Sequence, residues 1–207
     1  MKKILELATP MVPRVDVRTE HIAFFDSFDS ILLKEEGGIN KLVMAERLKS
    51  SAKNICLNIS CSDRNRSGIY SELLTAAALG FVRLLLSDGP HPRNTDFPAA
   101  KPVYDLDACS LLHLLKKNEP PFSQNVLPLN QLAAWEVGLQ IGGKTESDLM
   151  RAERCLADGA DFLFVCSPEA IPLIKKYADK PLILAFQEMK QEKQLLSGDG
   201  YGVFERV

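Results

Sequence analysis

The sequence of 207 residues has no run of lysine and arginine longer than two residues, and no long apolar stretch. With a formal net charge of −2 and an isoelectric point near 6.0, the chain has no basic excess that would attract a phosphate backbone. A membrane span requires about 20 apolar residues, and no stretch approaches that length. We therefore expect neither nucleic acid nor a membrane as a partner.

Metal-binding and disulfide patterns are also missing. The five cysteines, at positions 56, 61, 109, 155 and 166, contain no Cys-x-x-Cys pair, and the three histidines are scattered, so we expect no metal site. The cysteines are typical of reduced thiols in a cytoplasmic protein; Cys61 and Cys166 stand out because each falls at the end of a predicted strand. The opening Met1-Lys-Lys resembles a signal peptide, but Glu6 interrupts the apolar run too early for one.

Short apolar runs, with helical segments between most of them, dominate the rest of the chain. Hydrophobic residues make up 46% of the sequence, which is enough for one large core. Several runs are apolar throughout, as expected for a parallel sheet that helices cover on one face and side chains fill on the other. The eight runs predict an α/β fold of the (β/α)8 TIM-barrel type, in one domain over residues 1–207. They are Ile4–Ala8, His21–Phe25, Ile55–Cys61, Val82–Ser87, Glu136–Ile141, Phe162–Cys166, Pro181–Phe186 and Tyr201–Phe204.

The helices predicted between these runs have recognisable ends. They are Ile39–Ser51, Ile69–Leu79, Asp107–Lys116, Leu149–Ala157 and Ala170–Tyr177. Ser67 or Ser71 is expected to cap the second of them at its N-terminus, and Thr145 opens the fourth. Gly80 and Gly159 follow the last apolar positions of these two helices, as C-terminal caps do.

Two places depart from a regular barrel. Residues 10–20 contain two prolines and little helical periodicity, so we expect the first crossover helix to be missing. The last helix is expected to be missing too, because Val207 directly follows the eighth run. Missing outer helices expose apolar barrel wall, which predicts a homo-oligomer or a subunit of a complex. Of the two long loops, 89–106 is expected to be functional and 118–134 structural.

The most informative segment is 57–92, which reads as a strand, a polar turn, a helix and a second strand. This order is one βαβ unit with an aspartate at the carboxyl end of each strand, where parallel barrels and open sheets build their sites. Asp63 and Asp88 therefore rank above the other acidic residues as candidates for a functional site.

Several motifs resemble methylenetetrahydrofolate reductase, most closely the form of that family that is fused to methyltransferases. The motifs are Asp63-Arg-Asn-Arg, the helix from Ser71 to Gly80, the strand ending in Ser87-Asp88, Val103-Tyr-Asp-Leu-Asp, Glu6-Leu-Ala-Thr-Pro, and Asp148-Leu through Gly159-Ala-Asp-Phe. The resemblance covers roughly residues 1–170. It implies a barrel that holds FAD at the carboxyl ends of its strands, with the flavin passing a hydride from reduced nicotinamide to a one-carbon folate or a related pterin.

The resemblance also implies roles for individual residues. Glu6 matches the catalytic glutamate that protonates the folate, and Asp88 matches the aspartate beside the flavin ring that tunes its electrostatics. The residues implied to bind the cofactor are Asn58, Asp88, Tyr104, Asp148 and Arg154. For Glu6, Asp88 and Arg154 a structural role is the alternative. Glu6 would be an exposed carboxylate at a strand end, and Asp88 would cap a helix or shape a turn. Arg154 would lie on a solvated helix face, paired with Asp158.

The chain departs from the family's pattern at several positions. The sixth strand ends in Val165-Cys166, where family members have Thr-Gln with a glutamine that hydrogen-bonds the folate. Leu139, Asp26 and Cys155 stand where the family has an aromatic residue, a threonine and a basic residue. These departures keep a second hypothesis open: a non-catalytic barrel that binds a partner protein or a pterin, or one subunit of a larger redox complex.

Overall fold

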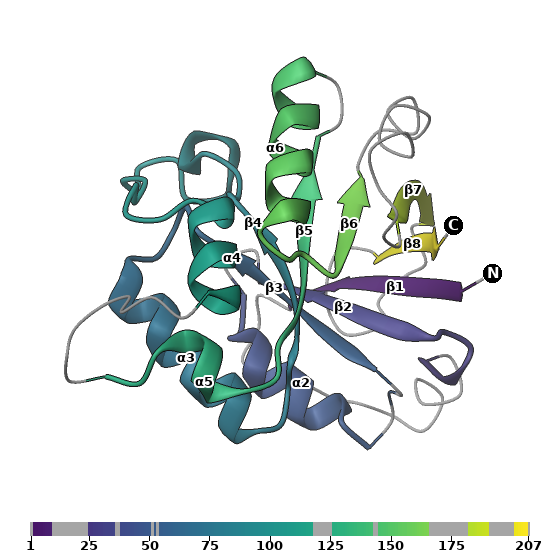
Figure 1. Cartoon of the computed structure of the whole chain (residues 1–207). Coiled ribbons are helices and arrows are strands. Elements are labelled where there is room, and N and C mark those ends of the chain that lie inside the picture. Colours follow the sequence, from purple (N-terminus) through teal and green to yellow (C-terminus); the bar gives the residue numbers. More distant parts are fainter. Residues whose placement is uncertain are drawn as a thin grey trace.

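The structure is a computed structural model that describes residues 2–9, 25–35, 38–50, 52, 54–117, 126–142, 145–165, 182–190 and 201–206. Strands and helices alternate along most of this part of the chain (Figure 1). The strands are β1 (Lys2–Ala8), β2 (Ser30–Lys34), β3 (Ile55–Ser60), β4 (Arg83–Ser87), β5 (Glu136–Ile141), β6 (Phe162–Val165), β7 (Leu182–Lys190) and β8 (Tyr201–Arg206). The helices are α2 (Lys41–Leu48), α3 (Arg66–Ala78), α4 (Ala108–Lys116), the short α5 (Leu129–Leu132) and α6 (Glu146–Ala157), with a 3-10 turn, η1, at Pro92–Asn94.

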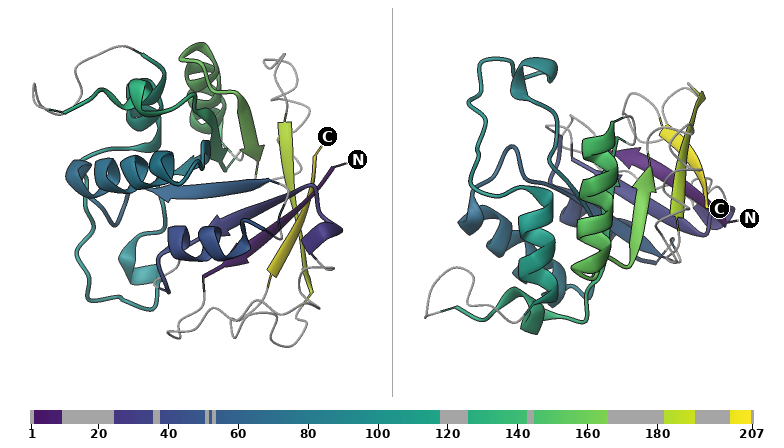
Figure 2. Two further views of the ribbon diagram at one scale, coloured as in Figure 1. Left: turned by 90° about the horizontal axis from the view of Figure 1, so that it is seen from below. Right: turned by 45° about the horizontal axis from the view of Figure 1, so that its top comes forward.

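The described strands form one curled sheet. β1 to β7 pair with one another in chain order and run parallel. β8 runs antiparallel to both β7 and β1, so hydrogen bonding passes right round the sheet. Figure 2 shows the described helices gathered on the side of β2 to β6, whereas β7 and β8 lie beside β1.

This architecture confirms the predicted α/β fold with a curled parallel sheet, and it corrects the direction of the last strand. A (β/α)8 barrel has eight parallel strands, whereas β8 is antiparallel to its neighbours. The connection between β7 and β8 is only 191–200, which is shorter than the dozen or so residues that a parallel crossover requires. The segment 10–20 and the predicted helix Ala170–Tyr177 lie outside the described residues.

The second strand lies later in the chain than predicted. The sequence favoured His21–Phe25, of which residues 21–24 lie outside the described part of the chain. β2 is Ser30–Lys34, and Phe25 itself is helical, with its ring buried in the core. The run from Ile31 to Leu33 explains this position, because three consecutive apolar residues suit a strand that is buried on both faces. Leu32 faces the barrel interior, and its two neighbours pack under the helices.

The N-terminus of α3 is also corrected by the structure. Asn65 is the N-cap, and its side-chain oxygen accepts a hydrogen bond from the Gly68 amide at 3.0 Å. Asparagine caps helices as well as serine does, so the helix begins before Ser67 and Ser71, and neither serine is the cap.

The structure confirms three predicted helix-end residues, Thr145, Gly80 and Gly159. Thr145 caps α6 in a reciprocal capping box with Asp148, in which each side chain accepts a hydrogen bond from the other's backbone amide at 3.1 Å. Gly80 and Gly159 follow α3 and α6 with φ angles of 81° and 105°. These angles are left-handed and favour glycine, so the two residues end their helices.

The main apolar core lies between the sheet and its helices. Leucines from α4 pack there with the outward-facing side chains of β4 and β5, among them Leu84, Leu86 and Val137. In the described part of the chain, the helices are too short or too polar to cross a membrane.

Candidate functional site

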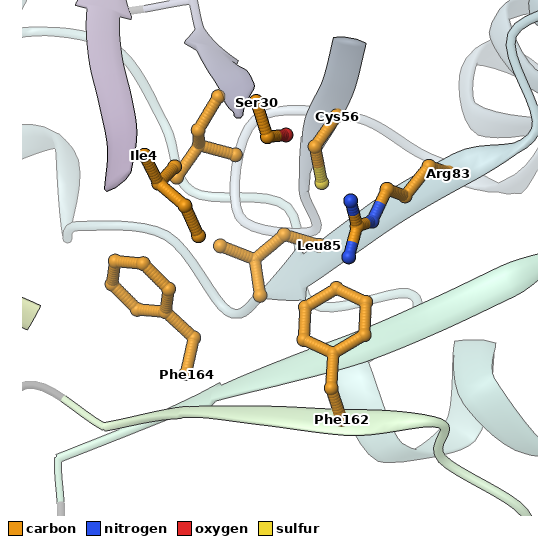
Figure 3. A pocket seen from close by; sticks show the side chains of 8 residues that line it. Ile4, Ser30, Cys56, Arg83, Leu85, Phe162 and Phe164 are labelled. Carbon is orange, nitrogen blue, oxygen red and sulfur yellow. The ribbon is translucent and has the colours of Figure 1, made fainter. Parts of the chain in front are cut away.

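The barrel interior is closed near the amino ends of the strands by apolar side chains. Alternate residues of each strand point inward, and six of them form a cluster that we call the lumen plug: Ile4, Leu32, Cys56, Leu85, Phe162 and Phe164 (Figure 3). The space left between the plug and the neighbouring Ser30 and Arg83 is about 10 Å³, room for at most one water molecule. Between these described side chains the lumen therefore has no room for a ligand larger than water.

Phe162 fits into the plug because the neighbouring strand places no side chain beside it. A Cβ atom on Gly138 would lie 2.0 Å from Cε2 of the Phe162 ring. The guanidinium of Arg83 lies 5.4 Å from the centre of the same ring and 3.0 Å from the Glu136 carboxylate. Glycine at position 138 is therefore a packing requirement of the lumen plug.

Toward the carboxyl ends of the strands the inward-facing residues become polar. Strand alternation places six of them there, which we call the mouth cluster: Glu6, Lys34, Asn58, Ser60, Ser87 and Gln140. Lys34 Nζ lies 2.8 Å from Glu6 Oε2. The buried Asn58 amide donates to the Leu85 carbonyl at 3.0 Å and to Ser87 Oγ at 3.1 Å. Such convergent polar groups are typical of a ligand site rather than of a packed core.

Asp88 directly follows β4 and faces the helices rather than the lumen. Leu85 and Ser87 point inward, so the alternation of the strand turns the next residue outward. Asp88 Oδ1 accepts a hydrogen bond from the Ala108 amide at the start of α4 at 2.9 Å, and Arg151 on α6 contacts both carboxylate oxygens. Asp88 thus binds the first amide of α4, whose N-cap is the neighbouring Asp107.

These contacts also set the pKa of Asp88. Burial favours a higher value, but the hydrogen bonds from Arg151 and from the Ala108 amide outweigh it and hold the pKa of Asp88 below its ordinary value. A carboxyl group whose pKa falls on folding stabilises the native state above its unfolded pKa, near 3.9. This stabilisation is lost as the pH falls through the lower pKa that Asp88 has in the folded protein.

Asp88→Asn is therefore expected to reduce the free energy of unfolding at neutral pH, by an amount that shrinks as the pH falls below about 4. Urea unfolding of both proteins between neutral and acidic pH measures this difference. Asp96→Asn, at an exposed loop position, is the matched control and is expected to change little. A difference between Asp88→Asn and wild type that stays constant with pH would contradict the assigned contacts.

The remaining residues implied to bind FAD are dispersed. Tyr104 lies in the loop after β4 and is 81% exposed. Asp148 belongs to the capping box at the start of α6, and Arg154 lies exposed in the last turn, about 9 Å further along the helix axis. The ion pair of Arg154 with Asp158 is not found among the described residues, where the Asp158 carboxylate lies 3.5 Å from His113 Nδ1.

The structure thus brings Glu6 and Asn58 to the same polar end of the lumen. Asp88 lies at that end too, but on the outer side of the sheet. Arg154 lies toward the opposite end, because α6 begins after the carboxyl end of β5 and runs back toward the amino end of β6. The roles of all six residues in catalysis and cofactor binding remain predictions.

The loop after β4 borders the mouth cluster, as its length and place in the sequence suggested. Gly89 has a φ of 79°, and a Cβ atom there would lie 2.1 Å from Ser60 Oγ, so the loop leaves β4 in close contact with β3. Further along, Arg66 Nε at the start of α3 lies 2.7 Å from Asp105 Oδ1 and holds the far part of the loop.

A ring of four charged side chains at the carboxyl ends of β2 and β3 was not expected from the sequence. Arg64 contacts the carboxylates of Glu35 and Glu72. Lys41 Nζ lies 2.5 Å from Glu72 Oε1 and 3.6 Å from Glu35 Oε2, so each cation touches both anions. Asp63 forms a longer ion pair with Arg64, with 3.9 Å between its Oδ1 and Arg64 Nε, and burial raises the pKa of Asp63. We call the four closely paired residues the ion ring.

Two partners of the predicted site residues were also missed. Lys34 is the last residue of β2. Because the sequence predicted the second strand at His21–Phe25, Lys34 was left outside the predicted barrel. Arg151 precedes Cys155 by four residues on α6, and residues with this spacing share one face of a helix. That periodicity was the available indication that Arg151 faces α4 and the end of β4 rather than solvent.

The cysteines at predicted strand ends do not provide a reactive thiolate in the described residues. Cys61 is buried, and burial followed by the charge of Asp88 raises its pKa to about 12. Cys56 in the lumen plug is raised to about 12 as well, chiefly by burial. A thiol with such a pKa stays protonated and unreactive at neutral pH. Cys166 lies outside the described residues.

The mouth cluster contains groups of the kind that tune a flavin ring. A flavin is tuned by hydrogen bonds to its ring nitrogens and by charge near the ring. Asn58 and Gln140 supply carboxamide groups, and Lys34 supplies a positive charge, all from inward-facing positions. The described residues of the mouth cluster therefore fit the ring of FAD, whereas none of them is an arginine suited to its diphosphate.

Comparison with models of protein families finds no match for this chain, and no curated protein matches it either. The resemblance to methylenetetrahydrofolate reductase therefore rests on the sequence motifs alone, and the family and its chemistry remain a proposal.

Proposed function

We propose that the protein is a flavin-dependent oxidoreductase of the methylenetetrahydrofolate reductase type, built on a divergent (β/α)8 barrel whose last strand is reversed. In this proposal it passes a hydride from reduced nicotinamide, through FAD, to a one-carbon folate or a related pterin. The observation that carries the proposal is the mouth cluster, a polar set at the carboxyl ends of parallel barrel strands, where enzymes of this architecture bind their ligands. The sequence motifs supply the identity of the cofactor.

FAD supplies hydride-transfer chemistry when it is bound. Asn58 and Lys34 hold the ring of the cofactor, and Tyr104 and Asp148 are further contacts assigned by resemblance. Arg154, which lies toward the amino ends of the strands, is left out of the proposed site. The lumen plug beneath the mouth cluster excludes water from the inner face of the site. Binding at this position therefore combines polar contacts at the ring edge with an apolar floor.

Glu6 is the proposed proton donor to the one-carbon substrate. Its carboxyl group faces the barrel interior on β1 and lies 2.8 Å from Lys34 Nζ, so the lysine fixes its orientation. Asp88 is the residue proposed to influence the flavin from the end of β4. Because Arg151 shares its charge, the two side chains act on the cofactor as a pair.

The purified protein is expected to carry flavin absorbance or to acquire it when FAD is added. Asn58→Ala should weaken FAD binding by about tenfold, because it removes a hydrogen-bonding amide from the mouth cluster. Quenching of flavin fluorescence during titration with protein measures the affinity. Asn54→Ala, which removes an exposed amide just before the amino end of the same strand, is the matched control and should bind FAD normally.

A second arm of the experiment adds reduced nicotinamide in the absence of oxygen, and loss of the flavin absorbance band is the expected result. A colourless protein that does not respond to saturating FAD would overturn the proposal at its first step. Equal affinities of Asn58→Ala and wild type would remove the mouth cluster as the binding site.

The alternative function is a barrel that binds a partner protein or a pterin without redox chemistry. One observation favours it: both carboxylate oxygens of Asp88 are already engaged by Arg151 and by the Ala108 amide. The flavin titration separates the two hypotheses, because the alternative predicts no flavin absorbance. A homo-oligomer or a complex subunit, and a cytoplasmic location, belong to the proposal in either case.

A further inference from the structure

Helices α4 and α6 bring two cysteines and an arginine together on the outer side of the barrel. Arg151 and Cys155 lie one turn apart on α6 and face α4. Arg151 Nε lies 3.1 Å from Cys109 Sγ, and Cys155, one turn along the same face of α6, is close enough to influence the pKa of Cys109. Neither cysteine has a role in the proposed function.

The surroundings of Cys109 favour the thiolate form. The hydrogen bond from Cys155 is the largest influence, and the Arg151 guanidinium adds to it; together they lower the pKa of Cys109 to about 6, although burial and Asp107 oppose them. Cys109 is also the second residue of α4, where the helix N-terminus favours negative charge. The pKa of Cys155 is raised because its thiol donates to Cys109. At neutral pH the pair is one thiolate and one thiol.

We propose that Cys109 and Cys155 are a redox-active pair, in which a hydroperoxide oxidises Cys109 and Cys155 then forms a disulfide with it. In the first step the Cys109 thiolate attacks a peroxide oxygen: an S–O bond forms, the O–O bond breaks, and the departing oxygen takes a proton to leave as water or alcohol. In the second step Cys155 attacks the sulfenic sulfur of Cys109, the S–S bond forms, and water leaves with the thiol proton.

The environment of the pair selects a small oxidant. Cys109 is only 6% exposed and lies under the side chain of Arg151, which is 31% exposed. The disulfide would join α4 to α6 and would remove the anionic partner of Arg151, leaving that side chain to Asp88 alone. Oxidation would thereby alter the helix contacts next to the carboxyl end of β4.

The test is a peroxide reaction of the full chain, followed by alkylation and peptide mass spectrometry. A cross-link between Cys109 and Cys155 is expected as the first product, while Cys56 and Cys61, which are equally buried but protonated, stay reduced. Cys155→Ser should leave Cys109 as a sulfenic acid that a 1,3-dione reagent traps. Failure to form the cross-link in the folded protein, or oxidation of Cys56 or Cys61 before Cys109, would overturn the proposal.

A pH profile separates the role of Arg151 from a merely structural one. The groups facing Cys109 are Arg151 and Cys155 on α6 and Asp107 at the start of α4. In the wild type the oxidation rate should approach its plateau at about pH 7, roughly one unit above the pKa of Cys109. In Arg151→Gln the rate should go on rising toward pH 8 and be about 3- to 10-fold slower at neutral pH. Arg93→Gln, an exposed arginine on η1, is the control and should keep the wild-type profile. Coincident profiles of wild type and Arg151→Gln would contradict the assigned thiolate.

Discussion

Gly138→Ala is expected to lower the free energy of unfolding by about 3 kcal/mol, at the upper end of the cost of overpacking a core. The added methyl group would lie 2.0 Å from Cε2 of Phe162, so the ring must move. The ring has little space to move into, because the lumen plug surrounds it and Arg83 stacks on it. Urea unfolding measures the loss, followed by fluorescence of the single tryptophan, Trp135, which is buried in the native state.

The double variant Gly138→Ala with Phe162→Leu tests the cause of this loss. If the ring is the obstacle, the double variant should be more stable than the sum of the two single effects predicts, by about 1 kcal/mol or more. Gly68→Ala is the control, because a Cβ there would meet neighbours at an ordinary 3.6 Å and the residue lies in α3. That substitution should gain about 0.5–1 kcal/mol. Additive effects at Gly138 and Phe162 would contradict the packing argument.

Glu72→Gln is expected to cost about 3–4 kcal/mol of unfolding free energy, because it leaves a buried cation short of one anion. Lys41 is 2% exposed and Glu72 is 4% exposed, so water cannot replace the lost carboxylate. Glu35 remains near Lys41, but at 3.6 Å it is the more distant of the two anions and is already shared with Arg64. The same unfolding experiment measures the effect.

An exposed ion pair supplies the matched control for the ion ring. Glu46 and Lys49 are each about half exposed and lie 3.5 Å apart, so Glu46→Gln should change the stability by less than about 0.5 kcal/mol. Replacing Lys41 by Met together with Glu72 by Leu removes one cation and one anion, and leaves Arg64 paired with Glu35. This double variant should recover most of the loss, because apolar residues of similar volume often replace a buried pair without cost. A double variant less stable than Glu72→Gln would contradict this account of the ion ring.

The fold could be predicted to the extent that it depends on local patterns. Fully apolar runs located most of the strands, and the capping residue Thr145 and the terminal glycines Gly80 and Gly159 located helix ends. Two apolar runs competed for the second strand, and composition alone could not show that Phe25 fills the core while Ile31–Leu33 joins the sheet. The direction of β8 depends on the short connection that precedes it. The alternation of strands and helices along the sequence predicted a parallel strand instead.

The candidate site was predictable at the level of position but not of contacts. The sequence placed Glu6 and Asp88 at strand ends, and the structure keeps both at that end of the barrel, with Asn58 of β3 beside Glu6 on its inner side. Which side chains meet them depends on strand register and helix phase. Lys34 meets Glu6 because β1 pairs with β2. Arg151 on α6 meets Asp88 at the end of β4, although the two residues are distant in the sequence.

The pairing of β1 with β8 has a consequence for the synthesis of the chain. β1 leaves the ribosome before the other described strands, yet one of its edges is completed only by β8, where Leu7 pairs with Tyr201. Until β8 has been synthesised, that edge presents unpaired amide and carbonyl groups, which are a template for another nascent chain. Among the described strands, this pairing has the greatest separation along the chain, so it carries the largest entropic cost of loop closure and is expected to form last.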